Sequence, residues 1–112
     1  MAIEGRIWIS NNKGVHLGKG RILLLKLIEE QGSLSKAAVA AKISYRKAWE
    51  QIREMNEHSE NLLVEMSTGG KGGGSAKLTE RAKELIRLYE ELEKEHQNFL
   101  EAKQKAFERL WK

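Results

Sequence analysis

A cluster of glycines between residues 69 and 74 constrains the fold more than any other feature of the chain. Five of the ten glycines lie there, and they surround one lysine, Lys71. Apolar residues 62–64 precede the cluster, and Leu78 follows it. Because glycine costs backbone entropy and packs no side chain, a domain clusters it where φ must be positive or the backbone must approach another molecule. The charge of Lys71 indicates that such a molecule would be anionic.

The segment before this loop predicts a hairpin and a helix. Residues 6–10 alternate with a period of two, as in a half-buried strand, and residues 15–17 can return after a turn. A helix is expected over residues 19–31 because its apolar residues form one wide face. That face comprises Ile22, Leu24, Leu25, Leu27 and Ile28.

Two short helices with serine caps follow, and they predict a helix-turn-helix. Ser33 is a suitable N-cap for a helix through Ala41, and Ser44 for a helix over residues 45–59. Alanines on the first helix allow the second to cross it closely, so the pair fits that motif. The buried stripe of the second helix is expected to be Ala48, Ile52 and Met55.

The glycine loop then joins two strands, at residues 63–67 and 76–78. Thr79 is an N-cap for a final helix that can exceed thirty residues, because neither proline nor glycine interrupts residues 79–112. This order predicts a mainly α fold with small β-hairpins, a winged helix-turn-helix over residues 1–78 followed by a long C-terminal dimerisation helix over residues 79–112.

The final helix carries an apolar heptad pattern that predicts a homodimer. It is too long for a body of this size to bury, so its distal half is expected to pack on a second copy. The pattern is imperfect, with His96 and Lys103 in core positions, and the alternative is a charged helix that frays beyond Phe99. The predicted dimer interface comprises Leu85, Leu88, Leu92, Phe99 and Ala106.

Basic residues are segregated along the chain. The net charge is +4, and the whole excess lies in residues 1–78. Residues 5–28, 31–49 and 66–78 contain no acidic side chain. Such segregation is expected of a surface that faces phosphates, although chance on a mildly basic protein is the alternative.

In a winged helix the second helix of the helix-turn-helix enters the DNA major groove, with its N-terminal residues at the base edges. Arg46 can bind a guanine edge, and Lys47 suits guanine or phosphate. Trp49 either contacts DNA or covers the edge of the core. The alternatives are that Arg46 and Lys47 are simply solvated charges, and that the glycine loop is a flexible hairpin that binds no ligand. The predicted DNA-binding residues are Ser33, Ser35, Lys36, Ser44, Tyr45, Arg46, Lys47, Trp49 and Lys71.

Other chemistries find little support. The glycine loop lacks the Lys-Ser/Thr that a P-loop requires after its last glycine. The three histidines are far apart and the chain has no cysteine, so neither a metal site, a cofactor nor an enzyme is expected. No apolar run approaches a membrane span and no signal peptide is evident, so a cytoplasmic, nucleoid-associated protein is expected.

Several segments resemble the N-terminal DNA-binding domain of the ModE family, bacterial and archaeal molybdate-responsive transcription regulators with a LysR-like winged helix. Ser-Tyr-Arg-Lys-Ala-Trp at residues 44–49 and Thr-Gly-Gly-Lys-Gly-Gly-Gly at residues 68–74 are the specific motifs. The resemblance covers most of residues 18–90. It implies a homodimeric transcription regulator that binds specific double-stranded DNA.

This sequence departs from the family pattern in two ways. The family's molybdate sites lie in C-terminal oxyanion-binding domains, which residues 1–112 do not include, so molybdate is a doubtful partner. Members usually have glycine in the turn before Ile43, where this chain has Lys42. A left-handed lysine would cost roughly 1 kcal/mol. Either the turn has another geometry, or Lys42 accepts the strain to place a charge near DNA.

Two other functions stay open on the sequence alone. The chain could be a dimeric winged-helix module for protein interactions, without specific DNA binding. It could also be a sensor in which the amides of the glycine loop bind a free oxyanion.

Overall fold

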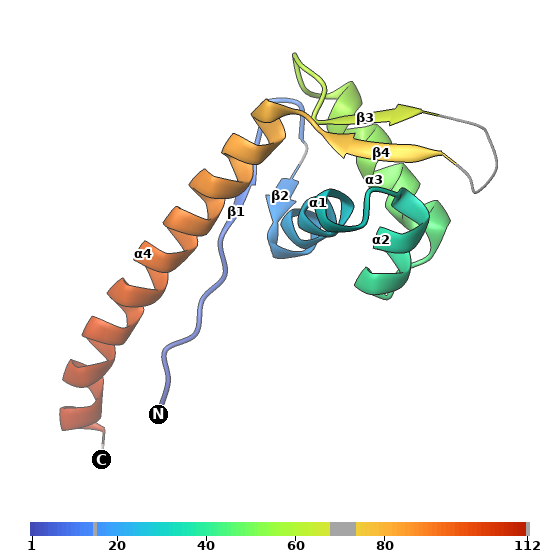
Figure 1. The fold of residues 1–112 in the computed structure, drawn as a ribbon. Coiled ribbons are helices and arrows are strands. Elements are labelled where there is room, and N and C mark those ends of the chain that lie inside the picture. The colour runs from blue at the N-terminus through green and yellow to red at the C-terminus, as the bar shows by residue number, and fades with distance from the viewer. Residues whose placement is uncertain (15, 68–73, 112) are drawn as a thin grey trace.

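The computed structural model describes residues 1–14, 16–67 and 74–111. In these residues the chain forms four helices and two antiparallel hairpins (Figure 1). The elements in chain order are β1 (Trp8–Ser10), β2 (His16–Gly18), α1 (Lys19–Gln31), α2 (Leu34–Ala41), α3 (Tyr45–Glu57), β3 (Val64–Ser67), β4 (Ser75–Leu78) and α4 (Glu80–Leu110).

The helix boundaries follow from local capping. Ser33 Oγ accepts a hydrogen bond from the Lys36 amide at 3.1 Å, and Ser44 Oγ accepts one from the Lys47 amide at 3.0 Å. Each serine therefore satisfies one of the free amides in the first turn of its helix. Gly32 ends α1 in the left-handed conformation, with φ 70°. The predicted helix-turn-helix is confirmed in both helices and in the turn between them.

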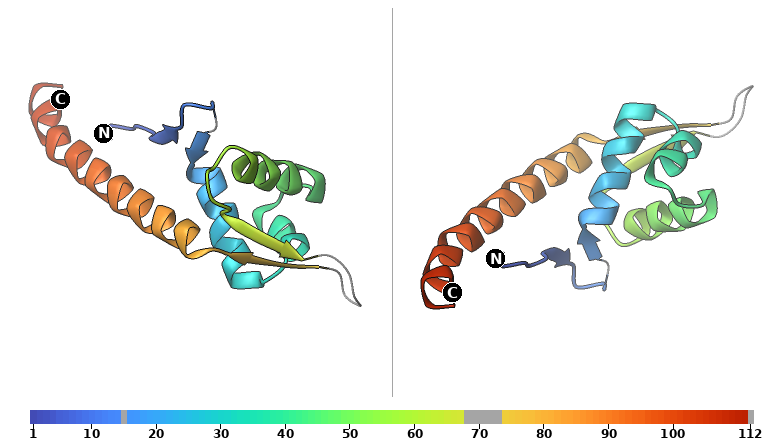
Figure 2. Two further views of the ribbon diagram at one scale, coloured as in Figure 1. Left: turned by 90° about the horizontal axis from the view of Figure 1, so that it is seen from above. Right: turned by 90° about the horizontal axis from the view of Figure 1, so that it is seen from below.

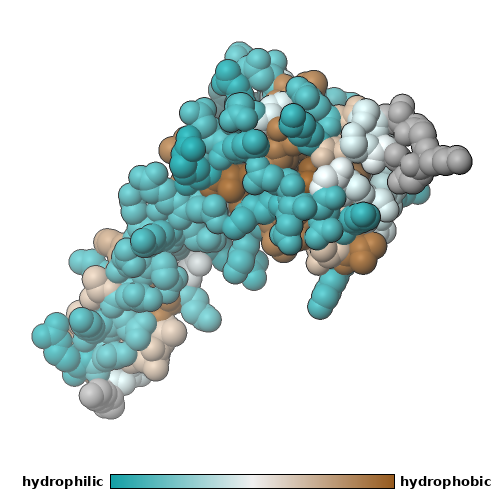
Figure 3. All heavy atoms as spheres, viewed as in Figure 1, coloured by the Kyte–Doolittle hydropathy of each residue, from teal (hydrophilic) through white to brown (hydrophobic). Residues whose placement is uncertain are grey.

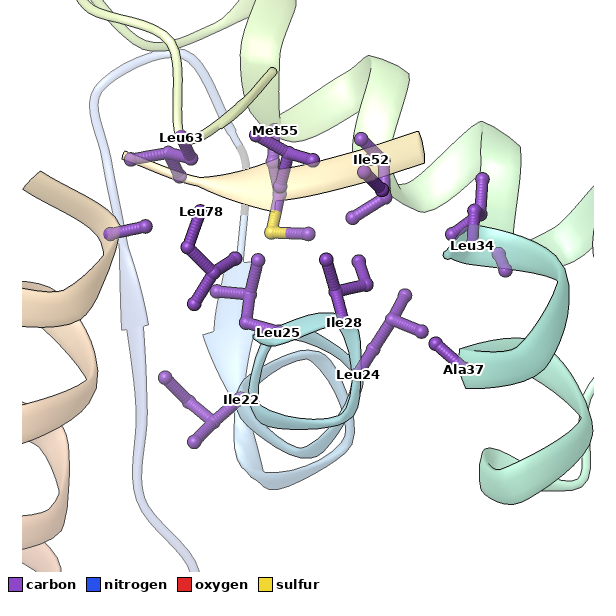
Figure 4. Close-up of a cluster of buried hydrophobic side chains, with 14 of the residues drawn as sticks. Ile22, Leu24, Leu25, Ile28, Leu34, Ala37, Ile52, Met55, Leu63 and Leu78 are labelled. Atoms are coloured by element: carbon purple, nitrogen blue, oxygen red, sulfur yellow. The ribbon is translucent and has the colours of Figure 1, made fainter. Parts of the chain in front are cut away.

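One hydrophobic core joins the first three helices, the second hairpin and the start of α4. Figure 4 shows side chains from α1, α2 and α3 gathered in one cluster with Leu63 and Leu78. The predicted stripe of α3 is at most 1% exposed, and four of the five predicted core residues of α1 are buried. Leu27, the fifth, packs partly buried against the core.

The hairpin β3–β4 forms the wing. It pairs Val64 with Leu78 and Met66 with Ala76, and Val64, Ala76 and Leu78 face the core. Asn56 at the end of α3 holds the hairpin in place, because its side chain donates to Val64 O at 2.9 Å and accepts from the Leu63 amide at 2.9 Å. The glycine tip with Lys71 lies outside the described residues.

Helix α4 begins in the core and then leaves the body (Figures 1 and 2). Thr79 Oγ1 accepts from the Ala82 amide at 3.3 Å, and Ala82, Ile86 and Tyr89 are buried in the core. The helix continues without a break to Leu110. The fold is thus a winged helix with a long C-terminal helix, as the sequence predicts. The division of the chain at residue 79 stays a prediction.

The N-terminal arm, residues 1–7, runs along α4 and was not foreseen from the sequence. Tyr89 Oη donates to Ile7 O at 3.2 Å, and Gln104 Nε2 donates to Met1 O at 2.8 Å. A Cβ on Gly5 would lie 3.1 Å from His96 Cε1, so only glycine fits this approach without displacing its neighbour. The arm and α4 lie side by side in the views of Figures 1 and 2.

The first hairpin differs from its predicted form. The alternation in residues 6–10 predicted a half-buried strand, but β1 starts at Trp8 and all three of its residues are exposed. Ile7, just before the strand, packs against the core instead. The reason is that β1 belongs to a two-stranded sheet at the edge of the body, so neither of its faces is buried under a second layer.

Polar contacts attach α4 to α1. Lys26 Nζ lies 2.7 Å from Glu90 Oε2, and this hydrogen bond raises the pKa of Lys26 above its usual 10.5. Burial raises the pKa of Tyr89 above its usual 10.0, because the phenolate would be poorly solvated there.

None of the helices in the described part of the chain combines the length and the hydropathy that a membrane span requires.

Candidate nucleic-acid interface

The N-terminal half of α3 presents polar and basic side chains to solvent. Ala48, Ile52 and Met55 hold one face of the helix in the core, so the opposite face must point outward. Tyr45, Arg46, Lys47 and Trp49 are all exposed, and the Arg46 side chain is 88% accessible. The structure therefore brings together four of the predicted DNA-binding residues on one exposed surface.

Neighbouring side chains orient two members of this surface. Arg46 Nε lies 3.2 Å from Glu50 Oε1, one turn further along α3. The guanidinium of Arg53 lies 5.4 Å from the ring centroid of Trp49, a cation–π distance. Trp49 is 42% exposed, so it is not enclosed in the core and its ring remains accessible beside Arg53.

The serine caps and α2 extend the basic surface. Ser35 and Lys36 are exposed in the first turn of α2, and Ser44 is exposed at the start of α3. Ser33 is half-buried, and its hydroxyl oxygen is engaged as a cap. With Lys42, this region carries four basic residues and no acidic one from residue 31 to residue 49. The surface is therefore positively charged on the side where α3 begins.

The wing adds one described lysine. Lys77 lies on β4, exposed, and is paired in register with Glu65 on β3. Lys71, which the sequence predicts to contact DNA from the wing, lies outside the described residues.

Two contacts that position α3 were not predicted from the sequence. Arg21 Nη2 in α1 lies 2.8 Å from Glu54 Oε1 in α3, and Asn56 ties the same helix to the wing. Both involve residues whose charge or polarity is ordinary for a helix surface. The sequence does offer one signal for Asn56. Asparagine has a low helix propensity, so its place near the end of a predicted helix suggests that its side chain has another partner.

The part of α4 from Leu88 onward forms a second candidate surface, made of apolar side chains. Leu88 is 60% exposed and Phe99 is 58% exposed, with Leu92 and Ala106 also exposed. Leu85 differs from these four, because it is half-buried and packs against the core of its own chain. In Figure 3 the region of distal α4 and the N-terminal arm shows apolar patches between hydrophilic ones.

This surface is distinct from the face that the arm covers. Tyr89, His96 and Gln104 face the arm, whereas Leu88, Leu92 and Phe99 lie on an adjacent face of the same helix. On this second face the Lys103 ammonium lies 5.6 Å from the centroid of the Phe99 ring, and Leu88, Leu92 and Phe99 stay exposed. Within the described residues, no group of histidine and acidic side chains could hold a metal ion.

Comparison with curated proteins gives several relatives. The DNA-binding transcriptional dual regulator ModE of Escherichia coli K12 is 50% identical over 90 residues, which cover 80% of this chain and 32% of that protein. The transcriptional regulator ModE of Yersinia pestis is 49% identical over the same length, with the same shares covered. The chain belongs to the ModE family. It matches the N-terminal part of these regulators, as the sequence resemblance predicts.

The match to the ModE family extends to less similar members. The molybdenum transport protein ModE of Azotobacter vinelandii is 35% identical over 96 residues, or 86% of this chain and 36% of that protein. The chain spans about a third of the length of the ModE relatives it matches. A search against protein-family models found no match.

Proposed function

We propose that this protein is a transcription regulator that binds specific double-stranded DNA as a homodimer. The N-terminal end of α3 enters the major groove, and the wing lies on the adjacent backbone. The relatives support this role by name, since one is called a DNA-binding transcriptional dual regulator. The residues that carry the contact are proposed from the geometry of this chain.

The observation that carries the proposal is the exposed, acid-free start of α3. Arg46 and Lys47 lie in the first turn of a helix whose opposite face is locked in the core. The positive end of the helix dipole adds to their charge. The Arg46–Glu50 pair is exposed and worth little in water, so Arg46 can exchange Glu50 for a guanine edge at small cost.

The homodimer places two such surfaces on one duplex. Leu88, Leu92, Phe99 and Ala106 would pack against the same residues of a second copy, which suits a two-fold interface. Two recognition helices related by this symmetry predict a pseudo-palindromic site.

Selection of bound sequences from random duplexes tests the proposal. We expect a two-fold symmetric motif and an affinity that falls by several orders of magnitude between about 50 and 200 mM salt, as for ~6–10 phosphate contacts. The Arg46→Ala, Lys47→Ala double variant should bind at least about tenfold more weakly, because a guanine contact is worth about 1–3 kcal/mol.

A matched control separates the site from the overall charge. The Lys94→Ala, Lys105→Ala double variant loses the same charge on exposed positions of α4 and should keep its affinity. Equal losses in both variants, or no dependence on salt, would contradict the proposed interface.

A further inference from the structure

The turn between α2 and α3 contains a strained residue. Lys42 has φ 60° and ψ 39°, in the left-handed region. It is the one non-glycine residue at positive φ in residues 1–14, 16–67 and 74–111. A side chain with a Cβ pays a steric cost in this conformation that glycine avoids.

The helix-turn-helix imposes this conformation. The Lys42 amide donates to Val39 O at 3.1 Å, and the Ile43 amide donates to Ala38 O at 3.1 Å. Ile43 then packs against the core, and Ser44 caps α3. These bonds form the left-handed C-cap that commonly ends a helix and is usually occupied by glycine. The position therefore favours glycine, and a lysine there lowers the stability of the free chain.

The lysine side chain offers no compensation within the folded chain. It is exposed, and it forms no ion pair or side-chain hydrogen bond with any described residue. It lies two residues before Ser44, within the acid-free segment from residue 31 to residue 49. The strained position is thus beside the surface proposed to meet DNA.

We propose that Lys42 binds a DNA phosphate at the edge of the groove that α3 enters, an inference that rests on the proposed function. A lysine suits phosphate as a compact charge on a long stem. Phosphate contacts fix the orientation of a protein on the duplex without reading its sequence. Lys42 would therefore set the position of α3 in the groove, and the contact would offset the strain of the free turn.

The test compares three substitutions at this position with a distant one. Lys42→Gly removes the charge and the strain together, so Tm should rise while DNA binding weakens. Lys42→Asn removes the charge but tolerates the left-handed region, and it should weaken binding equally. Lys42→Arg keeps the charge and should keep the affinity. Lys105→Gln removes one exposed charge on α4 and should change neither quantity.

The measurements are thermal unfolding and fluorescence anisotropy with the selected duplex at several salt concentrations. Losing one phosphate contact should lower the salt slope by about 0.9 per chain, which corresponds to roughly tenfold in affinity per chain near 0.1 M salt. The loss should be the same for the selected duplex and for one of unrelated sequence.

Different results overturn different statements. If the unmodified chain binds no duplex, the proposed function fails. If it binds, and Lys42→Gly keeps the affinity and salt slope, the phosphate contact is wrong. If Lys42→Gly weakens binding but Lys42→Asn does not, a loosened turn rather than a lost charge is the cause, and the contact is again wrong. A lower Tm for Lys42→Gly would refute the strain.

Discussion

Helices α3 and α4 carry the same kind of apolar stripe, but only α3 buries the whole of it within the chain. Ile52 and Met55 of α3 are each 1% exposed, whereas Leu92 and Phe99 of α4 are 42% and 58% exposed. Periodicity predicts which residues share a helix face. The elements available to pack on that face decide whether it is buried, and a second copy is the neighbour that we propose for the open stripe of α4.

The length of α4 explains the difference. Its 31 residues make a helix about 46 Å long, and the molecule is 62 Å in its longest dimension but only 29 Å in the next. The first turns of α4 reach the core through Ala82 and Ile86. Beyond Tyr89, Lys26 of α1 still reaches Glu90. Further along the helix, the N-terminal arm is the neighbour among the described residues, and it covers a different face.

The largest expected effect is on the buried stripe. Ile52→Ala should lower the free energy of unfolding by about 2–5 kcal/mol, because it removes buried methyl groups and leaves a cavity among α1, α3 and the wing. Urea unfolding followed by circular dichroism measures the change.

Leu92→Ala is the matched substitution on the open stripe. In a solution dilute enough to dissociate a dimer, it should change the free energy of unfolding by less than about 0.5 kcal/mol, as for an exposed site. Similar losses in both variants would show that the distal part of α4 is buried by its own chain.

The second-largest expected effect is on the proposed pairing of α4 with α4 of a second copy. Leu92→Lys with Phe99→Lys should shift a dimer to monomers, because two charges would have to be desolvated in the interface on each chain. Sedimentation velocity should show at least about a hundredfold weaker self-association, since a buried unpaired charge commonly costs several kcal/mol.

The control adds the same charge elsewhere on α4. Gln97→Lys with Asn98→Lys changes two exposed residues away from the apolar stripe and should leave self-association unchanged. An unmodified chain that stays monomeric at high concentration would refute the homodimer, while the DNA contacts of a single chain could still be measured.

Local signals made most of the fold predictable from the sequence. Ser33, Ser44 and Thr79 each accept the cap bond that their position predicted. The spacing of Ala48, Ile52 and Met55 identified the buried face of α3, and with it the exposure of Arg46 and Lys47. In these cases, the interactions that decide the structure lie within a few residues of one another.

Contacts between distant residues were not predictable in the same way. Tyr89 bonds Ile7 across 82 positions, and Gln104 bonds Met1 across 103. Residues 1–7 have no periodicity that marks them as a partner for a helix. The bond from Arg21 to Glu54 and the clamp of Asn56 on the wing also depend on the folded arrangement, because many surface residues of these types could pair.

The smallest expected effect concerns the arm, which runs along distal α4. Gly5→Val should lift the arm, because even a Cβ at this position would lie 3.1 Å from His96 Cε1 and 3.4 Å from Leu100 Cδ1. The free energy of unfolding should fall by about 1 kcal/mol or less, since a terminal segment can move away instead of straining the core. Hydrogen exchange should accelerate in residues 93–104. Gly20→Ala serves as the control, because a Cβ there meets nothing within 4 Å. If exchange in α4 stays unchanged in Gly5→Val, the arm does not support the helix, and a second copy would be its main stabilising neighbour.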